Sequence, residues 1–210
     1  MNLPRLYAIV DVSCFAMPLR TTAAIVDYAR DLASGGATLI QYRNKIGTTR
    51  EMLDDVRELR RALAGNVILM VNDRADVCIA AELQGVHVGQ DDLSPEDARR
   101  VVGANRVVGA STHTDDQVRA ADSTGADYIA IGPAFATGTK IDTEPVVGLE
   151  GIRRARALTA KPLVAIGGIT RANARSVLDA GADSIAVISA LLAPGESVEQ
   201  VARDFLELLR

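Results

Sequence analysis

Short apolar runs recur along the chain, separated by segments in which apolar and charged residues follow a helical spacing. The runs are rich in β-branched residues and nearly continuous in apolar character, as expected of parallel strands covered by helices. The segments between them are amphipathic, and several open with Ser or Thr followed by acidic residues, which is typical of a helix N-terminus. The predicted strands are LYAIVD (6–11), LIQYR (39–43), VILMVND (67–73), GVHVG (85–89), RVVGAST (106–112), YIAIG (128–132), LVAIGG (163–168) and SIAVIS (184–189).

Eight strands, each followed by a helix, predict one α/β domain over residues 1–210, a (β/α)₈ TIM barrel. A weak internal repeat supports this count, because GGATLIQY, TGADYIAIG and AGADSIAVI each place Gly-Ala between a helix and a strand. The glycine is expected to form a left-handed helix cap in each case. An open doubly wound sheet is the alternative, but no G-x-G-x-x-G motif follows the first strand.

Composition excludes several classes of partner. The net charge of −4 does not attract nucleic acid or anionic membranes, and an aromatic content of 3% argues against base stacking. No apolar run is long enough to span a membrane and no signal-peptide pattern opens the chain, so a cytoplasmic protein is expected. Cys14 and Cys78 have neither metal-ligand spacing nor the number needed for a disulfide framework. The sequence leaves the oligomeric state open, a homo-oligomer included.

In a barrel of this kind the chemistry lies at the C-terminal ends of the strands. The second predicted strand ends in QYRNK, where Gln41, Arg43 and Lys45 alternate and therefore point to one side of an extended backbone. Two cations and an amide at the barrel mouth suit a polyanionic group. A solvated surface turn is the alternative interpretation.

Carboxylates follow the next two strands. Asn72 and Asp73 end the third, and Asp91 and Asp92 follow the fourth. Neighbouring carboxylates repel each other unless a cation lies between them, and carboxylates with substrate phosphates are the usual ligands of Mg²⁺. The alternative is that Asp73 or Asp92 caps the helix that follows it.

The fifth strand ends in GASTHT, with Ser111 and His113. A nucleophile and base are not favoured, because no third group orients them, and Ser111 is expected to donate a hydrogen bond to substrate. His87 is interpreted as a packed strand residue.

The loop GPAFATGTK after the sixth strand offers the hydroxyls of Thr137 and Thr139, the backbone of Gly138 and the charge of Lys140. These groups suit a phosphate.

The seventh and eighth strands end in Gly167 and Gly168 and in Ile188 and Ser189, where barrels of this fold commonly bind phosphate. Two anion sites, one assisted by metal and one built from backbone, predict an enzyme that joins two phosphorylated substrates.

LYAIVD, QYRNK, VND, GVHVGQDD, GASTHT, GPAFATGTKIDTEPVVG, AIGGIT and AVISALL occur in this order between about residues 6 and 208. Together they resemble the thiamine-phosphate synthase family. The resemblance implies a (β/α)₈ barrel that joins 4-amino-5-hydroxymethyl-2-methylpyrimidine diphosphate to 4-methyl-5-(2-phosphooxyethyl)thiazole. The products are thiamine monophosphate and diphosphate, and the family's mechanism is dissociative, with no protein nucleophile.

The resemblance also implies roles for individual residues. The pyrimidine diphosphate is contacted by Gln41, Tyr42, Arg43, Asn44, Lys45, Asn72, Ser111 and Lys140, of which Arg43, Lys45, Ser111 and Lys140 are catalytic. Mg²⁺ is held by Asp73 and Asp92, with Asp91 outside the ligand set. The thiazole phosphate is bound by Thr137, Gly138, Thr139, Gly168, Ile188 and Ser189.

Three alternatives differ in the residues that they need. A thiazole tautomerase of the same superfamily tends to lose the Asp pair and to carry His where this chain has Pro133. An isomerase or aldolase barrel needs a base or a lysine in an apolar pocket, whereas Lys45 and Lys140 lie in polar loops. A non-catalytic phosphate-binding barrel leaves the two Asp residues unexplained.

Overall fold

The computed structural model describes residues 2–15, 20–63, 65–138 and 144–210. Within these residues eight parallel strands form a closed barrel in chain order, with β8 paired to β1. The strands are β1 (Leu6–Asp11), β2 (Leu39–Arg43), β3 (Ile68–Asn72), β4 (Gly85–Val88), β5 (Val107–Thr112), β6 (Tyr128–Ile131), β7 (Leu163–Ile166) and β8 (Ser184–Val187).

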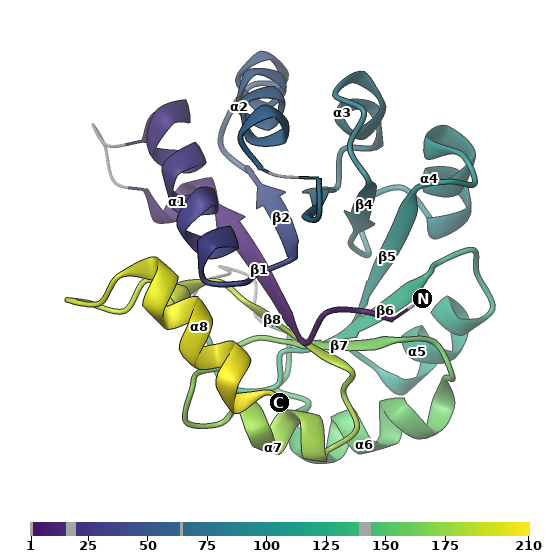
Figure 1. Cartoon of the computed structure of the whole chain (residues 1–210). Coiled ribbons are helices and arrows are strands. Elements are labelled where there is room, and N and C mark those ends of the chain that lie inside the picture. The colour runs from purple at the N-terminus through teal and green to yellow at the C-terminus, as the bar shows by residue number, and fades with distance from the viewer. Residues whose placement is uncertain (1, 16–19, 64, 139–143) are drawn as a thin grey trace.

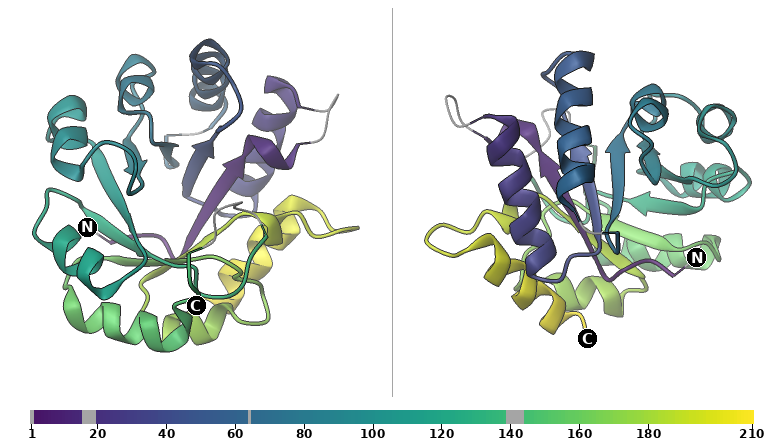
Figure 2. Two further views of the ribbon diagram at one scale, coloured as in Figure 1. Left: turned by 180° about the vertical axis from the view of Figure 1, so that it is seen from behind. Right: turned by 45° about the horizontal axis from the view of Figure 1, so that its top comes forward.

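A helix follows each strand and packs on the outside of the barrel (Figure 1). The two further views show the same ring of helices around the strands (Figure 2). The helices are α1 (Thr22–Ser34), α2 (Thr49–Ala62), α3 (Ala75–Ala80), α4 (Pro95–Val102), α5 (Asp115–Asp122), α6 (Gly148–Leu158), α7 (Ala174–Asp179) and α8 (Val198–Leu208), with short 3₁₀ turns η1 (Val12–Cys14) and η2 (Ser189–Leu191).

The predicted (β/α)₈ barrel is confirmed, and strand bounds agree with the prediction to within two residues. The expected helix N-termini are confirmed as well. Thr48 and Glu51 form a capping box at α2, and Ser94 caps α4 with Pro95 in its first turn. These predictions hold because each capping side chain accepts a hydrogen bond from a backbone N–H group that the helix itself cannot pair.

The predicted glycine caps are confirmed at two of the three repeats. Gly36 and Gly181 have left-handed φ angles of 102° and 108°. Gly125 does not adopt a left-handed φ, so the cap predicted there is wrong. The chain leaves α5 instead through Thr124, whose hydroxyl accepts a hydrogen bond from the Ala126 N–H at 3.2 Å.

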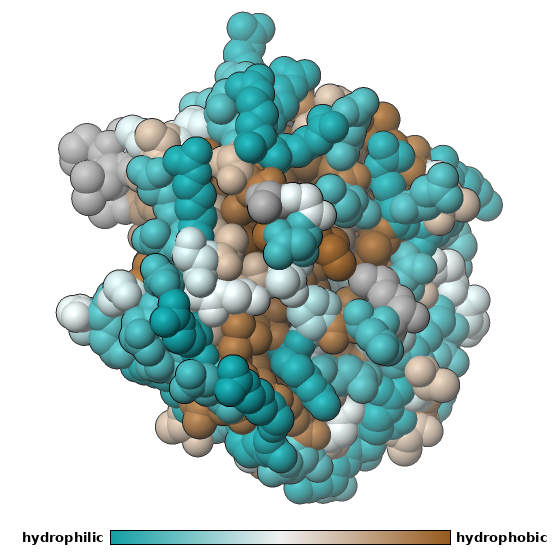
Figure 3. Space-filling view, in the orientation of Figure 1, coloured by the Kyte–Doolittle hydropathy of each residue, from teal (hydrophilic) through white to brown (hydrophobic). Residues whose placement is uncertain are grey.

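Alternation along the strands separates two apolar layers. One set of side chains fills the barrel interior, and the other, larger set packs between the strands and the helices. Hydrophilic side chains cover most of the face seen in Figure 3, as expected of helices whose apolar stripe faces the barrel. No helix in the described ranges is long and apolar enough to cross a bilayer. The interior layer consists of Tyr7, Ile9, Leu39, Met70, Tyr128, Ala130, Val164 and Ala186.

Gly109 in β5 makes room for a tyrosine ring inside the barrel. A Cβ atom at this position would lie 2.1 Å from Cζ of Tyr128 and 2.3 Å from its hydroxyl oxygen, far inside van der Waals contact. Tyr128 is completely buried, so its ring has no solvent space to move into.

Gly109→Ala is therefore expected to lower the free energy of unfolding by about 1–3 kcal/mol through overpacking, and the midpoint of thermal unfolding by several degrees. Gly125→Ala is the matched control, because its Cβ would meet only Arg99 atoms at 3.7 and 3.8 Å. Calorimetry of both variants tests this. Equal stability of the two would show that the barrel interior can relax around Tyr128.

Candidate active site

A cavity of about 500 Å³ opens at the C-terminal ends of the strands, and residues that follow each of the eight strands line it. This end of a (β/α)₈ barrel is where its enzymes carry their chemistry. The cavity collects most of the residues singled out in the sequence. Those in its lining are Arg43, Lys45, Asn72, Asp73, Asp91, Asp92, Ser111, Thr137, Gly168, Ile188 and Ser189.

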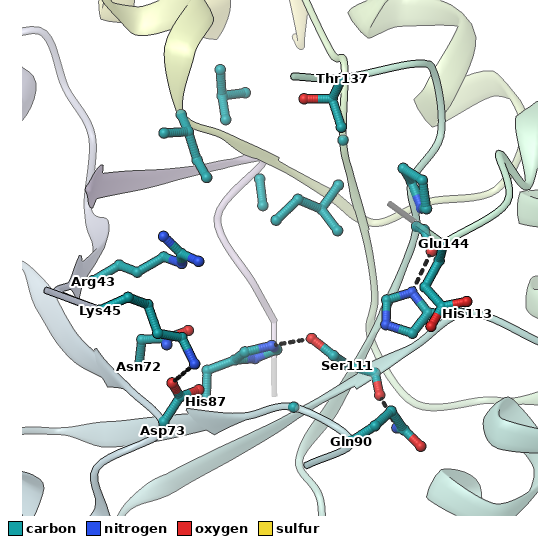
Figure 4. Close-up of a pocket in the computed structure, with 18 of the residues that line it drawn as sticks. Arg43, Lys45, Asn72, Asp73, His87, Gln90, Ser111, His113, Thr137 and Glu144 are labelled. Carbon is teal, nitrogen blue, oxygen red and sulfur yellow. Dashed lines mark hydrogen bonds and ion pairs between the residues drawn. The ribbon is translucent and has the colours of Figure 1, made fainter. Parts of the chain in front are cut away.

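Arg43 and Lys45 leave β2 on the same side of the chain and extend into the cavity side by side (Figure 4). Arg43 forms an ion pair with Asp11, the last residue of β1, whose side chain is fully buried. Asp11 also accepts hydrogen bonds from the N–H and the hydroxyl of Ser13, at 2.9 and 2.6 Å. The two hydrogen bonds from Ser13 hold the Asp11 carboxylate in place, and this carboxylate in turn fixes the guanidinium of Arg43 at the cavity wall.

Lys45 forms an ion pair with Asp73, at the end of β3. Burial, and after it a hydrogen bond with the Asp92 carboxyl, raise the pKa of Asp73 to about 6, although Lys45 opposes both effects. Asp73 also has a left-handed φ of 63°, which few residues other than glycine adopt. The strands therefore bring together two carboxylates that repel each other and one lysine that compensates only part of their charge.

The interpretation of these acids as helix caps is wrong. Helix α3 begins after Arg74 and has no side-chain cap, and Ser94 caps α4. Asp92 instead accepts a hydrogen bond from the Gly89 N–H at 2.9 Å, which holds its carboxylate beside β4. Among the described residues, no group of three or more His, Cys, Asp or Glu could hold a metal by itself. Two carboxylates fit a Mg²⁺ ion that takes its remaining oxygens from substrate phosphate and water.

Ser111 does not pair with His113. The His113 Nδ1 lies 2.7 Å from the carbonyl oxygen of Gly132, whereas Ser111 Oγ lies 2.8 Å from Nε2 of His87 (Figure 4). His87 is largely buried, as the sequence suggested, yet it also lines the cavity floor. Ser111 and His113 therefore do not form the Ser–His pair that the sequence does not favour.

Three residues of the QYRNK motif lie away from the cavity. Gln41 is buried inside the barrel and donates to the Tyr7 hydroxyl at 2.6 Å. Tyr42 points to the opposite side of β2 and donates to Asp55 at 2.6 Å. Asn44 donates to the Tyr42 hydroxyl at 2.9 Å.

Asn44 thereby orders the loop that carries Lys45. Its side-chain oxygen accepts the N–H groups of Ile46 and Gly47 at 3.0 and 2.7 Å. The structure does not bring Tyr42 or Asn44 to the cavity, because the two-residue period of the strand directs them outward.

The other side of the cavity is formed after β6, β7 and β8. Thr137 projects toward it from the loop after β6 (Figure 4). Gly138 is exposed and does not line it, and Thr139 and Lys140 lie outside the described residues. Ile188 and Ser189 lie where β8 leads into η2.

The two glycines after β7 are required by close packing. Gly167 and Gly168 have left-handed φ angles of 97° and 64°. A Cβ at Gly168 would lie 2.6 Å from the Ala136 carbonyl oxygen, and a Cβ at Gly167 would lie 2.6 Å from Cβ of Pro133. The loop after β6 therefore rests directly on the loop after β7, and both loops face the cavity.

Sequence reasoning missed Asp11 and the pairing of His87 with Ser111. Asp11 could have been found by its position, since it ends an apolar strand just as Asn72 and Asp73 do. The partner of His87 had no local signal, because 24 residues separate it from Ser111 and only the pairing of β4 with β5 joins them.

Comparison with known proteins identifies the family to which this chain belongs. The family model described as thiamine monophosphate synthase matches residues 6–191. A thiamine-phosphate synthase of Koribacter versatilis is 57% identical over 209 residues, which cover 100% of this chain and 97% of that protein. A thiamine-phosphate synthase of Chloroflexus aurantiacus is 43% identical over 206 residues, which cover 98% of this chain and 92% of that protein.

A solved structure agrees with these relatives. The thiamine phosphate pyrophosphorylase from Pyrococcus furiosus superposes with a TM-score of 0.84 at 34% identity, covering 98% of this chain and 95% of that chain. The similarity thus extends over the whole barrel and includes the cavity end.

The carboxyl pair gives a titration that can be measured in the metal-free protein. The pKa of Asp73 is raised from 3.8 to about 6. Between these two pH values, the folded chain therefore keeps a proton on Asp73 that the unfolded chain has released. This group therefore makes the fold less stable as the pH rises through that interval. Asp92→Asn should lower the pKa of Asp73 without returning it to 3.8, because burial, the largest cause, remains.

Carbon-13 NMR of the carboxyl groups measures this titration. Asp91→Asn is the matched control, since it removes the same charge one residue away and Asp91 is not among the groups that raise the pKa of Asp73. Equal shifts in the two variants would contradict the assignment of Asp92 as the partner.

Proposed function

The chain belongs to the thiamine monophosphate synthase family, and we propose that its cavity joins a pyrimidine diphosphate to a thiazole phosphate. Its activity is that of a thiamine-phosphate synthase, a transferase. The substrates we propose are 4-amino-5-hydroxymethyl-2-methylpyrimidine diphosphate and 4-methyl-5-(2-phosphooxyethyl)thiazole, and the products are thiamine monophosphate and diphosphate. Since both substrates are small charged molecules, we also propose a cytoplasmic location.

One observation carries the proposal. The two carboxylates of Asp73 and Asp92 lie in contact beside the cations Arg43 and Lys45, on one side of the cavity. Such a mixture of opposite charges does not suit a simple anion pocket, where the carboxylates would repel the ligand. It suits a diphosphate bound together with a divalent cation, because Asp73 and Asp92 would hold the cation while Arg43 and Lys45 would pair with the phosphates.

Mg²⁺ is the ion that this donor set favours, with Asp73 and Asp92 as its protein ligands. When bound, it would neutralise charge on the diphosphate leaving group. Lys45 forms an ion pair with Asp73, and with Mg²⁺ bound to that carboxylate the Lys45 ammonium would be available to a phosphate oxygen. Arg43 stays fixed by Asp11 and presents a planar donor pair to phosphate oxygens.

The thiazole phosphate is proposed to bind on the opposite side of the cavity, against Thr137, Gly168, Ile188 and Ser189. The close packing of the loops after β6 and β7 supports this assignment, because it holds hydroxyl and backbone donors at fixed positions. A monophosphate that does not react needs only such positioning.

The reaction needs charge stabilisation and positioning. The bond between the pyrimidine's exocyclic carbon and the diphosphate oxygen breaks, and the electron pair leaves with the diphosphate. The 4-amino group of the pyrimidine delocalises the positive charge left on carbon, and the thiazole nitrogen then forms the new carbon–nitrogen bond. Arg43 and Lys45 stabilise the charge that develops on the leaving group. No protein nucleophile is required for this sequence of bond breaking and bond formation.

The direct test mixes the protein with both substrates and Mg²⁺ and follows thiamine monophosphate and diphosphate, with EDTA as the metal control. Asp92→Ala is expected to reduce turnover by about a hundredfold or more, because the leaving group loses its counter-charge. Asp91→Ala, one residue away, should retain most of the activity. A comparable loss in both variants would show that the choice of ligand is wrong. Thiazole-phosphate binding without product would instead favour the tautomerase or a binding protein.

A second variant tests the thiazole-phosphate side. Ser189→Ala should raise the KM for the thiazole phosphate more than it lowers kcat, because the monophosphate does not take part in bond breaking. The KM for the pyrimidine diphosphate serves as the internal control and should stay unchanged. Steady-state kinetics with each substrate varied in turn measures both constants. A loss confined to kcat would remove Ser189 from this role.

A further inference from the structure

A chain of hydrogen-bonded side chains crosses the interior of the barrel and ends at the cavity. It runs from Gln41 through the hydroxyls of Tyr7 and Tyr128 to the ring of His87 and the hydroxyl of Ser111. The successive distances are 2.6, 3.0, 2.9 and 2.8 Å. Five different strands supply these five residues, so the closed barrel alone brings them together.

This series of hydrogen-bonded side chains lies in surroundings that are otherwise apolar. Tyr7 and Tyr128 belong to the interior layer, are 1% and 0% exposed and meet edge to face, with ring centroids 6.0 Å apart. The ring of Tyr128 also stacks on that of His87 at 5.6 Å. Polar groups buried this deeply are costly unless each one is hydrogen-bonded, so a complete chain calls for a physical reason.

The amide of Gln41 gives the chain a direction. Its nitrogen can only donate, so the Tyr7 oxygen accepts there and the Tyr7 proton is directed to Tyr128. The Tyr128 proton is then directed to Nδ1 of His87. A neutral imidazole that accepts at Nδ1 carries its proton on Nε2, which faces Ser111.

The reverse direction leaves one proton without an acceptor. If His87 donated from Nδ1, Tyr128 would donate to Tyr7, whose oxygen already accepts the Gln41 amide. The Tyr7 proton would then have no acceptor in the chain. Burial also raises the pKa of Tyr7 to about 12 and that of Tyr128 well above its usual value, so both hydroxyls keep their protons.

We propose that Tyr128 is a positioning residue that fixes His87 as a donor to Ser111, so that the Ser111 hydroxyl donates its own proton into the cavity. The chain thereby makes Ser111 a donor of defined direction, selective for a substrate atom that accepts, such as a ring nitrogen. This inference rests on the proposed function only for the identity of that substrate, the pyrimidine. The tautomer of His87 is a property of the protein alone.

The tautomer can be read by nitrogen-15 NMR of labelled histidine, at about pH 8, above the ordinary histidine pKa of about 6.5. The protein contains only two histidines, so their nitrogen signals are simple to assign. His87 is expected to carry its proton on Nε2. His113 is an internal reference for the opposite tautomer, because its Nδ1 faces the carbonyl oxygen of Gly132 and must carry the proton.

Three variants locate the group that sets the tautomer. Tyr128→Phe keeps the stacked ring, removes only the hydroxyl and should give a mixture of His87 tautomers while His113 is unchanged. Ser111→Ala, at the cavity end, should leave His87 protonated on Nε2. Tyr42→Phe, the matched control, removes another fully buried hydroxyl, one that bonds Asp55 outside this chain, and should not change His87.

The proposal is overturned if His87 of the unmodified protein carries its proton on Nδ1, or if Tyr128→Phe leaves the tautomer unchanged. It is also overturned if Ser111→Ala changes the tautomer as much as Tyr128→Phe does. Ser111→Ala and the unmodified protein keep the test decisive even if Tyr128→Phe does not fold. None of these spectra needs substrate, so they stand apart from any failure of the synthase assay.

Kinetics then tests the link to substrate. Tyr128→Phe should lower kcat/KM for the pyrimidine diphosphate about tenfold, the worth of one hydrogen bond, and leave the KM for the thiazole phosphate unchanged. A normal kcat/KM together with a mixed tautomer would overturn the role of Ser111 as an oriented donor to the pyrimidine. A purely structural role of Tyr128 would lower stability without this difference between the two substrates.

Discussion

Closure of the parallel sheet is the constraint on which the rest of the structure depends. Strand β8 pairs with β1 in the register Leu6 to Ile185, Tyr7 to Ala186 and Ala8 to Val187, which leaves no open edge among the described strands. Because all the strands are parallel, their carboxyl ends meet at a single rim. Polar residues that are far apart in the sequence thus become neighbours, and one cavity of about 500 Å³ receives side chains from every strand end.

Charge compensation organises that rim. Asp11 is buried and held by Ser13, so its ion pair fixes the position of the Arg43 guanidinium. Lys45 and Asp73 differ from this pair, because the carboxylate is shared with Asp92 and its pKa is raised. Arg43 is thereby held in place, while Lys45 is paired with a carboxylate that we propose as a Mg²⁺ ligand. This difference is consistent with the proposed role of both cations in stabilising a diphosphate leaving group.

The interior of the barrel contains hydrogen-bonded polar side chains that extend to the cavity. The hydrogen-bonded series from Gln41 to Ser111 brings polar groups into an otherwise apolar layer. Gly109 has no side chain and so leaves room for the ring of Tyr128. Tyr7 and Tyr128 are fully buried, and the hydroxyls of both are hydrogen-bonded within the barrel. A cavity floor built in this way orients a hydroxyl more strictly than a solvated loop can.

The sequence by itself determined the strands, the Ser and Thr caps at helix N-termini, the closed barrel and most of the rim. These features follow from local rules: apolar runs, Ser or Thr before a helix, and polar residues just after a strand. Alternation along β2 correctly directed Arg43 and Lys45 to the cavity, and the same rule explains why Tyr42 and Asn44 point away from it. The resemblance already implied that Asp73 and Asp92 act together, but the tertiary structure alone decided the other pairings. The contacts of Arg43 with Asp11 and of His87 with Ser111 cross between strands, and a contact between strands leaves no periodic trace along either one.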